Sequence, residues 1–307
     1  MSIALIAPDR DLRGLVQEIR QAAPDLIVQQ WPKLHQPEQI EFAVCWHAPR
    51  GIFSTLPSLK AASSLGAGID SLLSDPDLPP ELPIGRLTGS RLARDMAAWL
   101  LAHINREWFR LDRFDIDQGK QQWRPWSPSR PPRIGLLGTG AITEPLIQAA
   151  TALGFEIRGW NRRGTGIEGV AIHTGESGLL EMAATVDVLI CLLPLTAATR
   201  GILNAQLFSS MAQDSILINA GRGPQLVEED LLDALDQGRP ARAILDVFEH
   251  EPLPPGHPFW AHPAVRISPH CAAVSQDKET AALILESYLR VLQGLPPSGL
   301  VDRERGY

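Results

Sequence analysis

The stretch Arg133-Ile-Gly-Leu-Leu-Gly-Thr-Gly-Ala-Ile-Thr143 decides the fold of the chain. Ile134 to Leu137 is a short apolar run typical of a buried parallel strand, and residues 141–153 have the apolar spacing of a helix. Gly138 and Gly140 lie between them and allow a tight turn. A strand, a glycine turn and a helix N-terminus together direct backbone N–H groups and a positive dipole end towards an anion, which is the basis of a dinucleotide pyrophosphate site.

The glycine motif at this turn is incomplete, because Thr143 stands where G-x-G-x-x-G has its third glycine. A turn of this kind also occurs as a purely structural feature without a ligand, so the rest of the chain has to distinguish the two. We expect the bulk of Thr143 to change either the placement of the helix or the affinity for a cofactor. The expected cofactor contacts at this turn are Gly138, Thr139, Gly140, Ala141 and Ile142.

Composition limits the possible classes of protein. With 307 residues, the chain is long enough for two domains of ordinary size. Its 44% apolar residues indicate a globular protein, and its formal charge of -7 argues against a nucleic-acid partner, which requires a basic face. The most apolar interior run, residues 186–195, is too short to span a membrane. Neither the three cysteines nor the histidines of the 250–262 loop have metal-ligand spacing, so we expect no metal site. The three cysteines, far apart and odd in number, also offer no disulfide framework, so we expect a cytoplasmic protein.

Strands and helices alternate over nearly the whole chain. The apolar runs at 2–7, 26–30 and 42–46 are candidate strands of the N-terminal third, and residues 91–113 are expected to form one long helix. A final helix is expected at 276–292. Strands separated by helices indicate parallel, doubly wound sheets that bind ligands at the carboxyl ends of their strands. After the glycine turn, further strands are expected at 155–160, 186–193, 215–219, 242–247 and 265–268.

The segment from 121 to 132 is dense in proline and cannot form regular structure. We expect it to connect to a second domain. Trp123 and Trp126 lie on this segment, and exposed tryptophans are unusual unless a partner chain buries them. The segment therefore favours a homodimer.

The residues after the strand that ends at Trp160 indicate which dinucleotide is bound. NAD-binding folds place an acidic residue about 20 positions after the glycine turn, where it binds the ribose hydroxyls. Here that region reads Asn161-Arg162-Arg163-Gly164 and has no carboxylate. Guanidinium groups suit a 2′-phosphate, so these residues favour NADP(H) over NAD(H). The alternative is an ordinary solvated basic turn.

Three loops that follow strands carry candidate catalytic residues. Arg222 follows the strand at 215–219, Glu249 and Glu251 follow the strand at 242–247, and His270 follows the last strand. Reduction of a ketone requires a proton donor and a cation near the developing alkoxide, which such a histidine and arginine supply. Taken singly, the arginine is better interpreted as a surface loop residue and the histidine as a core residue with satisfied hydrogen bonds. We interpret Cys271 as a packing residue rather than a nucleophile.

A second glycine turn, Gly66-Ala67-Gly68, follows an apolar segment in the N-terminal third. Its backbone N–H groups could converge on a small carboxylate. The alternative interpretation is a flexible turn without a ligand.

Taken together, these segments resemble the D-2-hydroxyacid dehydrogenase family, whose motifs occur in the same order. Within the family, the chain resembles the glyoxylate/hydroxypyruvate reductase branch at three short segments: Trp46-His47, Trp160-Asn-Arg162 and Trp123-Arg-Pro125. The matching segments are Leu65-Gly-Ala-Gly-Ile-Asp70, Gly138-x-Gly140, Leu192-Leu-Pro-Leu-Thr196, Asn219-Ala-Gly-Arg-Gly223, Asp246-Val-Phe-x-x-Glu-Pro-Leu253 and Pro269-His-x-Ala-Ala273.

The resemblance implies an α/β protein with two doubly wound parallel-sheet domains, in which a Rossmann cofactor domain is inserted into a flavodoxin-like substrate domain. We expect the substrate domain to comprise residues 1–98 and 276–307, and the NADP-binding domain residues 99–275.

The resemblance also implies roles for individual residues. Arg222 would bind the substrate carboxylate and the C2 oxygen, His270 would be the general acid, and Glu251 would orient the imidazole and favour its protonated form. Only the Glu-Pro-Leu match selects Glu251 over Glu249. The implied substrate-binding residues besides Arg222 are Trp46, Gly66, Ala67 and Gly68. The further implied cofactor contacts are Leu193, Pro194, Thr199, Asn219, Ala220, Asp246, Ala272 and Ala273.

By this resemblance, the chain would use NADPH to reduce glyoxylate or hydroxypyruvate to glycolate or D-glycerate. Its only partners would be the small 2-oxo or 2-hydroxy acid and a second copy of the chain, with no nucleic acid or membrane. An alternative is a nucleotide-sensing protein similar to the C-terminal-binding-protein corepressors, which share the fold. Formate-type oxidation is disfavoured because Glu251, rather than an amide, precedes Pro252.

Overall fold

A computed structural model describes residues 2–306 and divides into two compact units. The terminal unit comprises the chain up to Leu92 and from Ser275 onwards, and the central unit comprises Ala93–Val274. The first boundary lies inside a helix, 98 − 92 = 6 residues before the position expected from the sequence. Among the described residues, no helix is long and apolar enough to cross a membrane.

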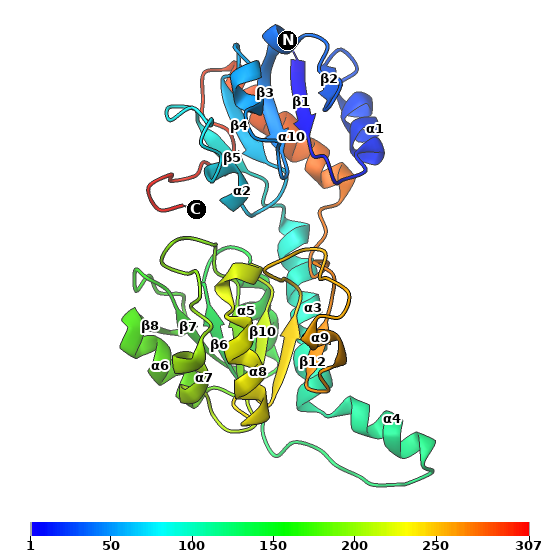
Figure 1. Cartoon of the computed structure of the whole chain (residues 1–307), viewed down its shortest axis with the longest axis vertical. Helices are drawn as coiled ribbons and strands as arrows, with labels where there is room; N and C mark the ends of the chain where they lie inside the picture. Colours follow the sequence, from blue (N-terminus) through cyan, green and yellow to red (C-terminus); the bar gives the residue numbers. More distant parts are fainter. Residues whose placement is uncertain (1, 307) are drawn as a thin grey trace. The chain divides into compact units, whose positions relative to one another are not determined.

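The terminal unit is built on a five-stranded parallel sheet with the strand order β2-β1-β3-β4-β5, which is the flavodoxin-like order (Figure 1). Helices α1 and α10 contact each other and cover one face of this sheet, so the last helix of the chain packs beside the first. The strands are β1 (Ser2–Ile6), β2 (Ile27–Gln30), β3 (Ile40–Cys45), β4 (Ala61–Ser64) and β5 (Ile84–Arg86). The helices are α1 (Arg13–Ala22), α2 (Asp70–Leu73) and α10 (Asp277–Leu292), with 3-10 turns at Pro37–Gln39 and Ile52–Thr55.

The central unit is built on a seven-stranded parallel sheet with the order β12-β11-β10-β9-β6-β7-β8. This is the Rossmann order with one added strand, and the order reverses between β6 and β9. The fold class predicted from the sequence is therefore confirmed. The strands are β6 (Arg133–Leu137), β7 (Glu156–Trp160), β8 (Ala171–His173), β9 (Val188–Cys191), β10 (Ile216–Asn219), β11 (Arg242–Leu245) and β12 (Val265–Ile267). The helices are α3 (Ser90–Trp108), α4 (Leu111–Gly119), α5 (Glu144–Ala152), α6 (Gly175–Thr185), α7 (Ala205–Ser210), α8 (Glu228–Asp236) and α9 (Pro258–Ala261), with a 3-10 turn at Gly223–Gln225.

The prediction of a single long helix at 91–113 is wrong, because the structure has two helices there, α3 and α4, with a break between them. Arg110 adopts a left-handed backbone conformation, with φ of 50°, and this interrupts the helix. Before the break, near the end of α3, the carboxylate of Glu107 is buried and pairs with Arg242. The Nε atom of Arg266 lies 3.8 Å from Oε1 of the same carboxylate. These ion pairs hold the end of α3 against strands β11 and β12.

Helix α4 and residues 120–132 form an arm that extends from the body of the central unit (Figure 1). The proline-rich segment indeed has no regular structure, but it lies within the central unit and does not connect the two units as expected. Trp123 is 95% exposed on this arm.

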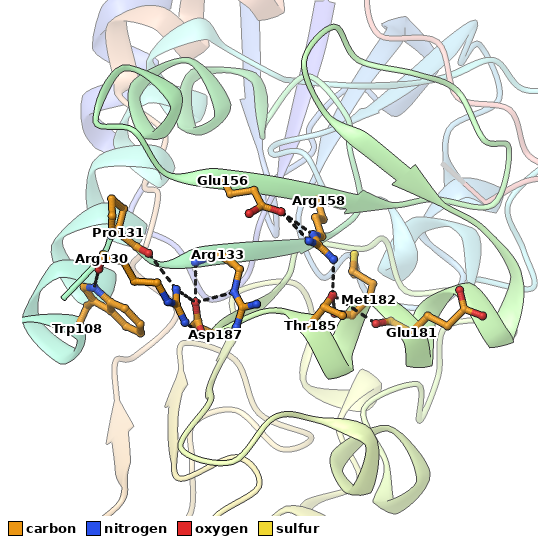
Figure 2. Close-up of polar contacts among 10 residues, drawn as sticks. All are labelled: Trp108, Arg130, Pro131, Arg133, Glu156, Arg158, Glu181, Met182, Thr185 and Asp187. Atoms are coloured by element: carbon orange, nitrogen blue, oxygen red, sulfur yellow. Dashed lines mark hydrogen bonds and ion pairs between the residues drawn. The ribbon is translucent and has the colours of Figure 1, made fainter. Parts of the chain in front are cut away.

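The arm returns to the sheet at Asp187, directly before β9 (Figure 2). Two nitrogens of the Arg130 side chain donate to the Asp187 carboxylate over 2.6 and 2.8 Å, and the backbone N–H of Arg133 donates over 2.8 Å. Burial alone would raise the pKa of Asp187, but the hydrogen bonds from both arginines outweigh burial and lower it to about 2. This cluster lies at the amino ends of β6 and β9, at the edge of the sheet opposite to the glycine turn.

Candidate active site

The glycine turn after β6 has the geometry that the sequence motif predicts. Gly138 has a φ of 96°, a conformation that favours glycine, and its N–H donates to the carbonyl of Trp160 over 3.0 Å. A Cβ atom at this position would lie 3.1 Å from the carbonyl oxygen of Leu192. At Gly140, by contrast, a Cβ atom would meet nothing within 4 Å, so the space above the second glycine is open.

The turn presents backbone donors without partners. Within residues 2–306, no protein group accepts a hydrogen bond from the N–H groups of Thr139, Gly140, Ala141 or Ile142. They lie at the carboxyl end of β6, next to the point where the strand order reverses, where open α/β sheets bind ligands. A cluster of free N–H groups above an open glycine fits the pyrophosphate of a dinucleotide.

Thr143 explains why α5 begins at Glu144, three residues (144 − 141) later than expected. Its side chain is 2% exposed and its hydroxyl donates to the carbonyl of Gly140 over 2.7 Å. Its backbone N–H donates to the same oxygen over 2.9 Å. These two bonds hold residues 140–143 as a turn and delay the start of the helix.

The basic loop after β7 is organised by Asn161. The Asn161 amide nitrogen donates to the Thr139 hydroxyl over 2.9 Å and to the carbonyl of Thr165 over 3.0 Å, and its oxygen accepts from the N–H of Arg163 over 3.0 Å. The Asn161 side chain therefore spends its hydrogen bonds on holding the loop in shape. Arg162 and Arg163 are exposed, and the Arg163 side chain has no hydrogen-bond or ion-pair partner within residues 2–306. An exposed cationic loop beside the glycine turn fits a 2′-phosphate.

The structure places His270 beside Glu251. The imidazole Nδ1 lies 2.7 Å from Glu251 Oε2, and the other carboxylate oxygen accepts from the backbone N–H of Phe248 over 3.0 Å. An imidazole nitrogen that faces a carboxylate carries the proton, so Nδ1 is the protonated nitrogen of the neutral ring. Glu249, the alternative acid, instead lies 3.6 Å from Arg200.

Electrostatics keep Glu251 ionised. Burial raises its pKa, whereas the hydrogen bonds from His270 and Phe248 and the positive charges of His270 and Arg222 lower it. The hydrogen bonds and positive charges together outweigh burial, so the pKa of Glu251 lies below its ordinary value. Glu251 is therefore a carboxylate at neutral pH and is the hydrogen-bond partner of His270 Nδ1.

The loop that carries His270 is anchored by Asp246. His270 has a left-handed backbone, with φ of 52°, and its N–H donates to the carbonyl of Asp246 over 2.8 Å. The buried carboxylate of Asp246 accepts from the Ser268 hydroxyl over 2.6 Å and from the N–H groups of Cys271 and Ala272 over 2.9 and 3.0 Å. Burial and the charge of Asp246 raise the pKa of Cys271, which keeps it a thiol and argues against a nucleophile.

The loop that carries Arg222 is shaped by a fully buried amide. Asn219 accepts from the N–H of Gly221 and donates to the carbonyl of Arg222, both over 3.2 Å. A Cβ atom at Gly223 would lie 1.8 Å from the carbonyl carbon of Phe248. Glycine thus allows the Arg222 loop to pass directly against the backbone that precedes Glu251.

The remaining expected cofactor residues divide into two groups. Thr199 and Asp246 are buried and use their side chains to hold loops, since the Thr199 hydroxyl donates to the carbonyl of Pro194 over 2.7 Å. Pro194 and Ala273 are partly exposed. The buried residues of the set, which border the site through their loops, are Leu193, Thr199, Asn219, Ala220, Asp246 and Ala272.

The expected substrate residues Trp46 and Gly66 to Gly68 lie in the terminal unit. Trp46 follows β3 and packs on Gly66, where a Cβ atom would lie 3.1 Å from the indole ring. Gly66 does not offer its N–H as expected, because it donates to the Ser64 hydroxyl over 3.3 Å. Within residues 2–306, the N–H groups of Ala67 and Gly68 have no protein acceptor and remain available.

Sequence reasoning missed two residues in these regions. The guanidinium carbon of Arg10 lies 3.8 Å from the ring centroid of Trp46, and burial lowers the pKa of Arg10. Gln225 is fully buried beneath the Arg222 loop. Residues so far apart in sequence, or with no motif of their own, give no local signal. The contact with Trp46 follows only from the strand order, which places the ends of β1 and β3 side by side.

Comparisons with known proteins show the family of the chain. The family model "D-isomer specific 2-hydroxyacid dehydrogenase, NAD binding domain" matches residues 98–272. The glyoxylate/hydroxypyruvate reductase A of Serratia proteamaculans is 38% identical, over 96% of this chain and 95% of that protein. The protein of the same name from Yersinia enterocolitica is 33% identical over the full length of both chains.

Two solved structures are similar over 100% of this chain and 99% of their own. A D-isomer specific 2-hydroxyacid dehydrogenase from Xanthobacter autotrophicus, in complex with NADPH and MES, has a TM-score of 0.92 and 32% identity. An NADPH-dependent glyoxylate/hydroxypyruvate reductase from Sinorhizobium meliloti, in complex with NADP and sulfate, has a TM-score of 0.91 and 32% identity. This chain therefore belongs to the NAD(P)-dependent D-isomer-specific 2-hydroxyacid dehydrogenases, in their glyoxylate/hydroxypyruvate reductase branch.

Proposed function

We propose that this enzyme uses NADPH to reduce glyoxylate and hydroxypyruvate to glycolate and D-glycerate. The observation that carries the proposal is the pair of His270 and Glu251, 2.7 Å apart, at the carboxyl edge of a dinucleotide-binding sheet. The names of its relatives, which are reductases of these two acids, support the same substrates.

The residues of this chain have complementary tasks in the reaction. NADPH, when bound, supplies the hydride that attacks C2 of the 2-oxo acid. Arg222 binds the carboxylate and the C2 oxygen, and its charge stabilises the negative charge that develops there. His270, with Nδ1 held by Glu251, directs Nε2 towards that oxygen and protonates it. Glu251 stays ionised and stabilises the imidazolium before the proton leaves.

The cofactor-binding residues fit NADP(H). We assign the pyrophosphate to the free N–H groups of residues 139–142, and the 2′-phosphate to Arg162 and Arg163. Asn161 holds this loop in shape. The two relatives of known structure bind NADPH or NADP, which supports the same choice.

We assign the substrate carboxylate to the positive charge of Arg222 in the central unit. In the terminal unit, the N–H groups of Ala67 and Gly68 are suited to a small carboxylate, and Trp46 packs on Gly66 in the same turn.

Steady-state oxidation of NADPH, followed by absorbance with a panel of 2-oxo acids, tests the proposal. We expect the highest kcat/KM with glyoxylate or hydroxypyruvate and a lower KM for NADPH than for NADH. A preference for branched or aromatic 2-oxo acids would overturn the substrate assignment, and a preference for NADH the cofactor assignment. Turnover with none of these acids would favour the nucleotide-sensing alternative.

We also propose that the enzyme is a homodimer that forms through the arm. Four large apolar side chains of α4 and the following segment are exposed, and a short segment that exposes this much apolar surface marks an interaction site. Their exposed fractions are 44% for Leu111, 37% for Phe114, 53% for Ile116 and 95% for Trp123. A second copy presents the same apolar surface, so a two-fold contact buries both.

We further propose a cytoplasmic location. All three cysteines are free, and Cys271 is exposed, which suits a reducing compartment. Fractionation of the producing cells tests this, and recovery of the protein outside the cytoplasmic fraction would contradict it.

A further inference from the structure

We propose that Gln225 is a positioning residue that holds Arg222 in place by tying its loop to the loop after β9. This inference rests on the proposed function, in which Arg222 binds the substrate carboxylate. Gln225 ends the 3-10 turn at Gly223–Gln225, three positions after the arginine, and has no exposed surface.

The side-chain amide of Gln225 uses its full hydrogen-bonding capacity. Its oxygen accepts from the backbone N–H of Arg222 over 2.8 Å and from the Cys191 thiol over 3.4 Å. Its nitrogen donates to the carbonyls of Leu193 over 2.8 Å and Pro194 over 3.2 Å. Two donors and two lone pairs are all that an amide offers, so every one of them is engaged.

These bonds join two loops that lie beyond the ends of their strands, where the hydrogen bonds between β9 and β10 have stopped. Leu193 and Pro194 follow β9, and Arg222 follows β10, beyond the last ladder pair of Cys191 and Asn219. A buried polar group without a partner is costly, so the amide keeps both loops in the one arrangement that satisfies all of its partners.

The neighbouring glycine makes room for this amide. A Cβ atom at Gly221 would lie 2.4 Å from the side-chain oxygen of Gln225 and 3.1 Å from the carbonyl oxygen of Leu193. Only glycine therefore lets the residue before Arg222 pass over the amide. The same geometry brings the loop of the candidate cofactor contacts next to the loop of the substrate arginine.

Loss of the amide displaces the backbone of Arg222 and with it the cation that receives the carboxylate. The effect on substrate binding precedes hydride transfer, so KM for the 2-oxo acid rises more than kcat falls. Because the Leu193–Pro194 loop loses its two bonds as well, binding of NADPH weakens in parallel.

Gln225→Met is the first test, because methionine has a similar length and neither donates nor accepts strongly. We expect KM for glyoxylate to rise about tenfold or more and kcat to fall less than about threefold. Kd for NADPH, measured by quenching of protein fluorescence, rises by a smaller factor.

Gln29→Met is the matched control. Gln29 is 7% exposed in β2, its nitrogen donates to the Ser2 hydroxyl over 3.1 Å and to the carbonyl of Gln36 over 3.2 Å, and its oxygen accepts from the N–H of Gln36 over 3.1 Å. It is a buried amide that makes three hydrogen bonds against the four of Gln225 and borders no candidate site. Its loss lowers the melting temperature but leaves KM, kcat and Kd for NADPH unchanged.

Gln225→Glu keeps the inference testable even if the methionine variant fails to fold. A protonated glutamic acid both donates and accepts, whereas a carboxylate cannot donate to the two carbonyls. Burial disfavours the charged form, so protonation as pH falls restores one of the two donors. Of the ionisable residues it faces, Cys191 has a pKa raised to about 12 by burial and stays a thiol, and the backbone N–H of Arg222 donates to the oxygen of residue 225.

The expected result is a KM ratio of Gln225→Glu to the unchanged enzyme that declines towards one between pH 8 and pH 5. A ratio that does not vary with pH, or a Gln225→Met variant that loses only thermal stability as the control does, would overturn the inference. Failure of the unchanged enzyme to turn over glyoxylate would count against the proposed function instead. In that case Kd for NADPH in the variants still decides whether Gln225 holds these loops.

Discussion

His270 is the residue whose removal has the most specific expected effect. Its Nδ1 is engaged with Glu251 at 2.7 Å, so the carboxylate orients the imidazole ring. A general acid contributes on the order of 10²- to 10⁴-fold to kcat. We expect His270→Ala to lower kcat by this factor while Kd for NADPH, measured by fluorescence titration, stays the same.

His250→Ala is the control for this prediction, because His250 is an exposed histidine one residue before Glu251 and is assigned no role. It should retain the turnover of the unchanged enzyme. Near-normal kcat in His270→Ala would refute the assignment of the general acid.

Arg163 is the residue on which the cofactor preference can be tested. Its side chain is exposed and has no partner within residues 2–306, so its removal costs the fold little. A hydrogen bond to a charged group contributes about 1.5–3 kcal/mol, so we expect Arg163→Ala to raise KM for NADPH about tenfold or more and leave KM for NADH unchanged. Arg239→Ala, which removes an exposed arginine bonded to Gln213 instead, should change neither value. Equal changes in both KM values for Arg163→Ala would contradict the 2′-phosphate assignment.

Sequence motifs identified candidate residues in the loops that follow strands, because several motifs of one family occur there in the family's order. Arg222, Glu251 and His270 were found this way, and the structure brings the last two together. The same motifs could not show that Asn219 and Asp246 are buried and hold loops, since burial depends on how loops from different strands pack. Gln225 belongs to the same class.

At the level of elements, the two edges of the central sheet have different tasks. The carboxyl edge carries the glycine turn and His270, whereas the amino edge carries the ion pairs of Asp187 with Arg130 and Arg133 (Figure 2). Asp187 has a side chain only 12% exposed and a pKa lowered to about 2, so its stabilisation is fully present above its ordinary pKa of about 4 and is lost as pH falls through about 2.

We expect Asp187→Asn to lower the free energy of unfolding at pH 7 by about 2 kcal/mol. The difference from the unchanged enzyme should shrink as pH falls from about 4 to about 2, because Asp187 then becomes protonated. Urea unfolding at several pH values measures it. The kcat and KM of the folded variant should stay unchanged, and a large loss of kcat at full folding would show that the amino edge also affects the site.

The elements that the sequence predicted correctly are those with an apolar, branched composition, such as β6 and β10. It missed β4, whose sequence Ala61-Ala-Ser-Ser64 has no strand-forming residue and yet is buried on all four positions. Tertiary context overrides local preference there, because both neighbours of β4 supply hydrogen bonds. The break at Arg110 was missed for the opposite reason, since the helical apolar pattern continues across it.

For the whole molecule, the discontinuous terminal unit could be predicted only through the resemblance to a family. Local patterns show helices and strands, but not that α10, after more than 180 residues of central unit, packs against α1. The strand orders then follow from handed crossover connections, which restrict parallel sheets to a few topologies.

The oligomeric state is the property of the whole molecule that the arm determines. Ile116 is 53% exposed on α4, one of the exposed apolar residues of the arm, so a charge there costs the isolated chain little but must be desolvated if a two-fold contact covers it. We expect the unchanged enzyme to sediment as a dimer at micromolar concentration and Ile116→Lys to sediment as a monomer with an unchanged far-UV circular dichroism spectrum. Leu153→Lys, at a 55% exposed position next to α5, is the control and should remain a dimer. A dimer in Ile116→Lys would place the contact elsewhere, and a monomer in the unchanged enzyme would show that the exposed apolar residues of the arm have another partner.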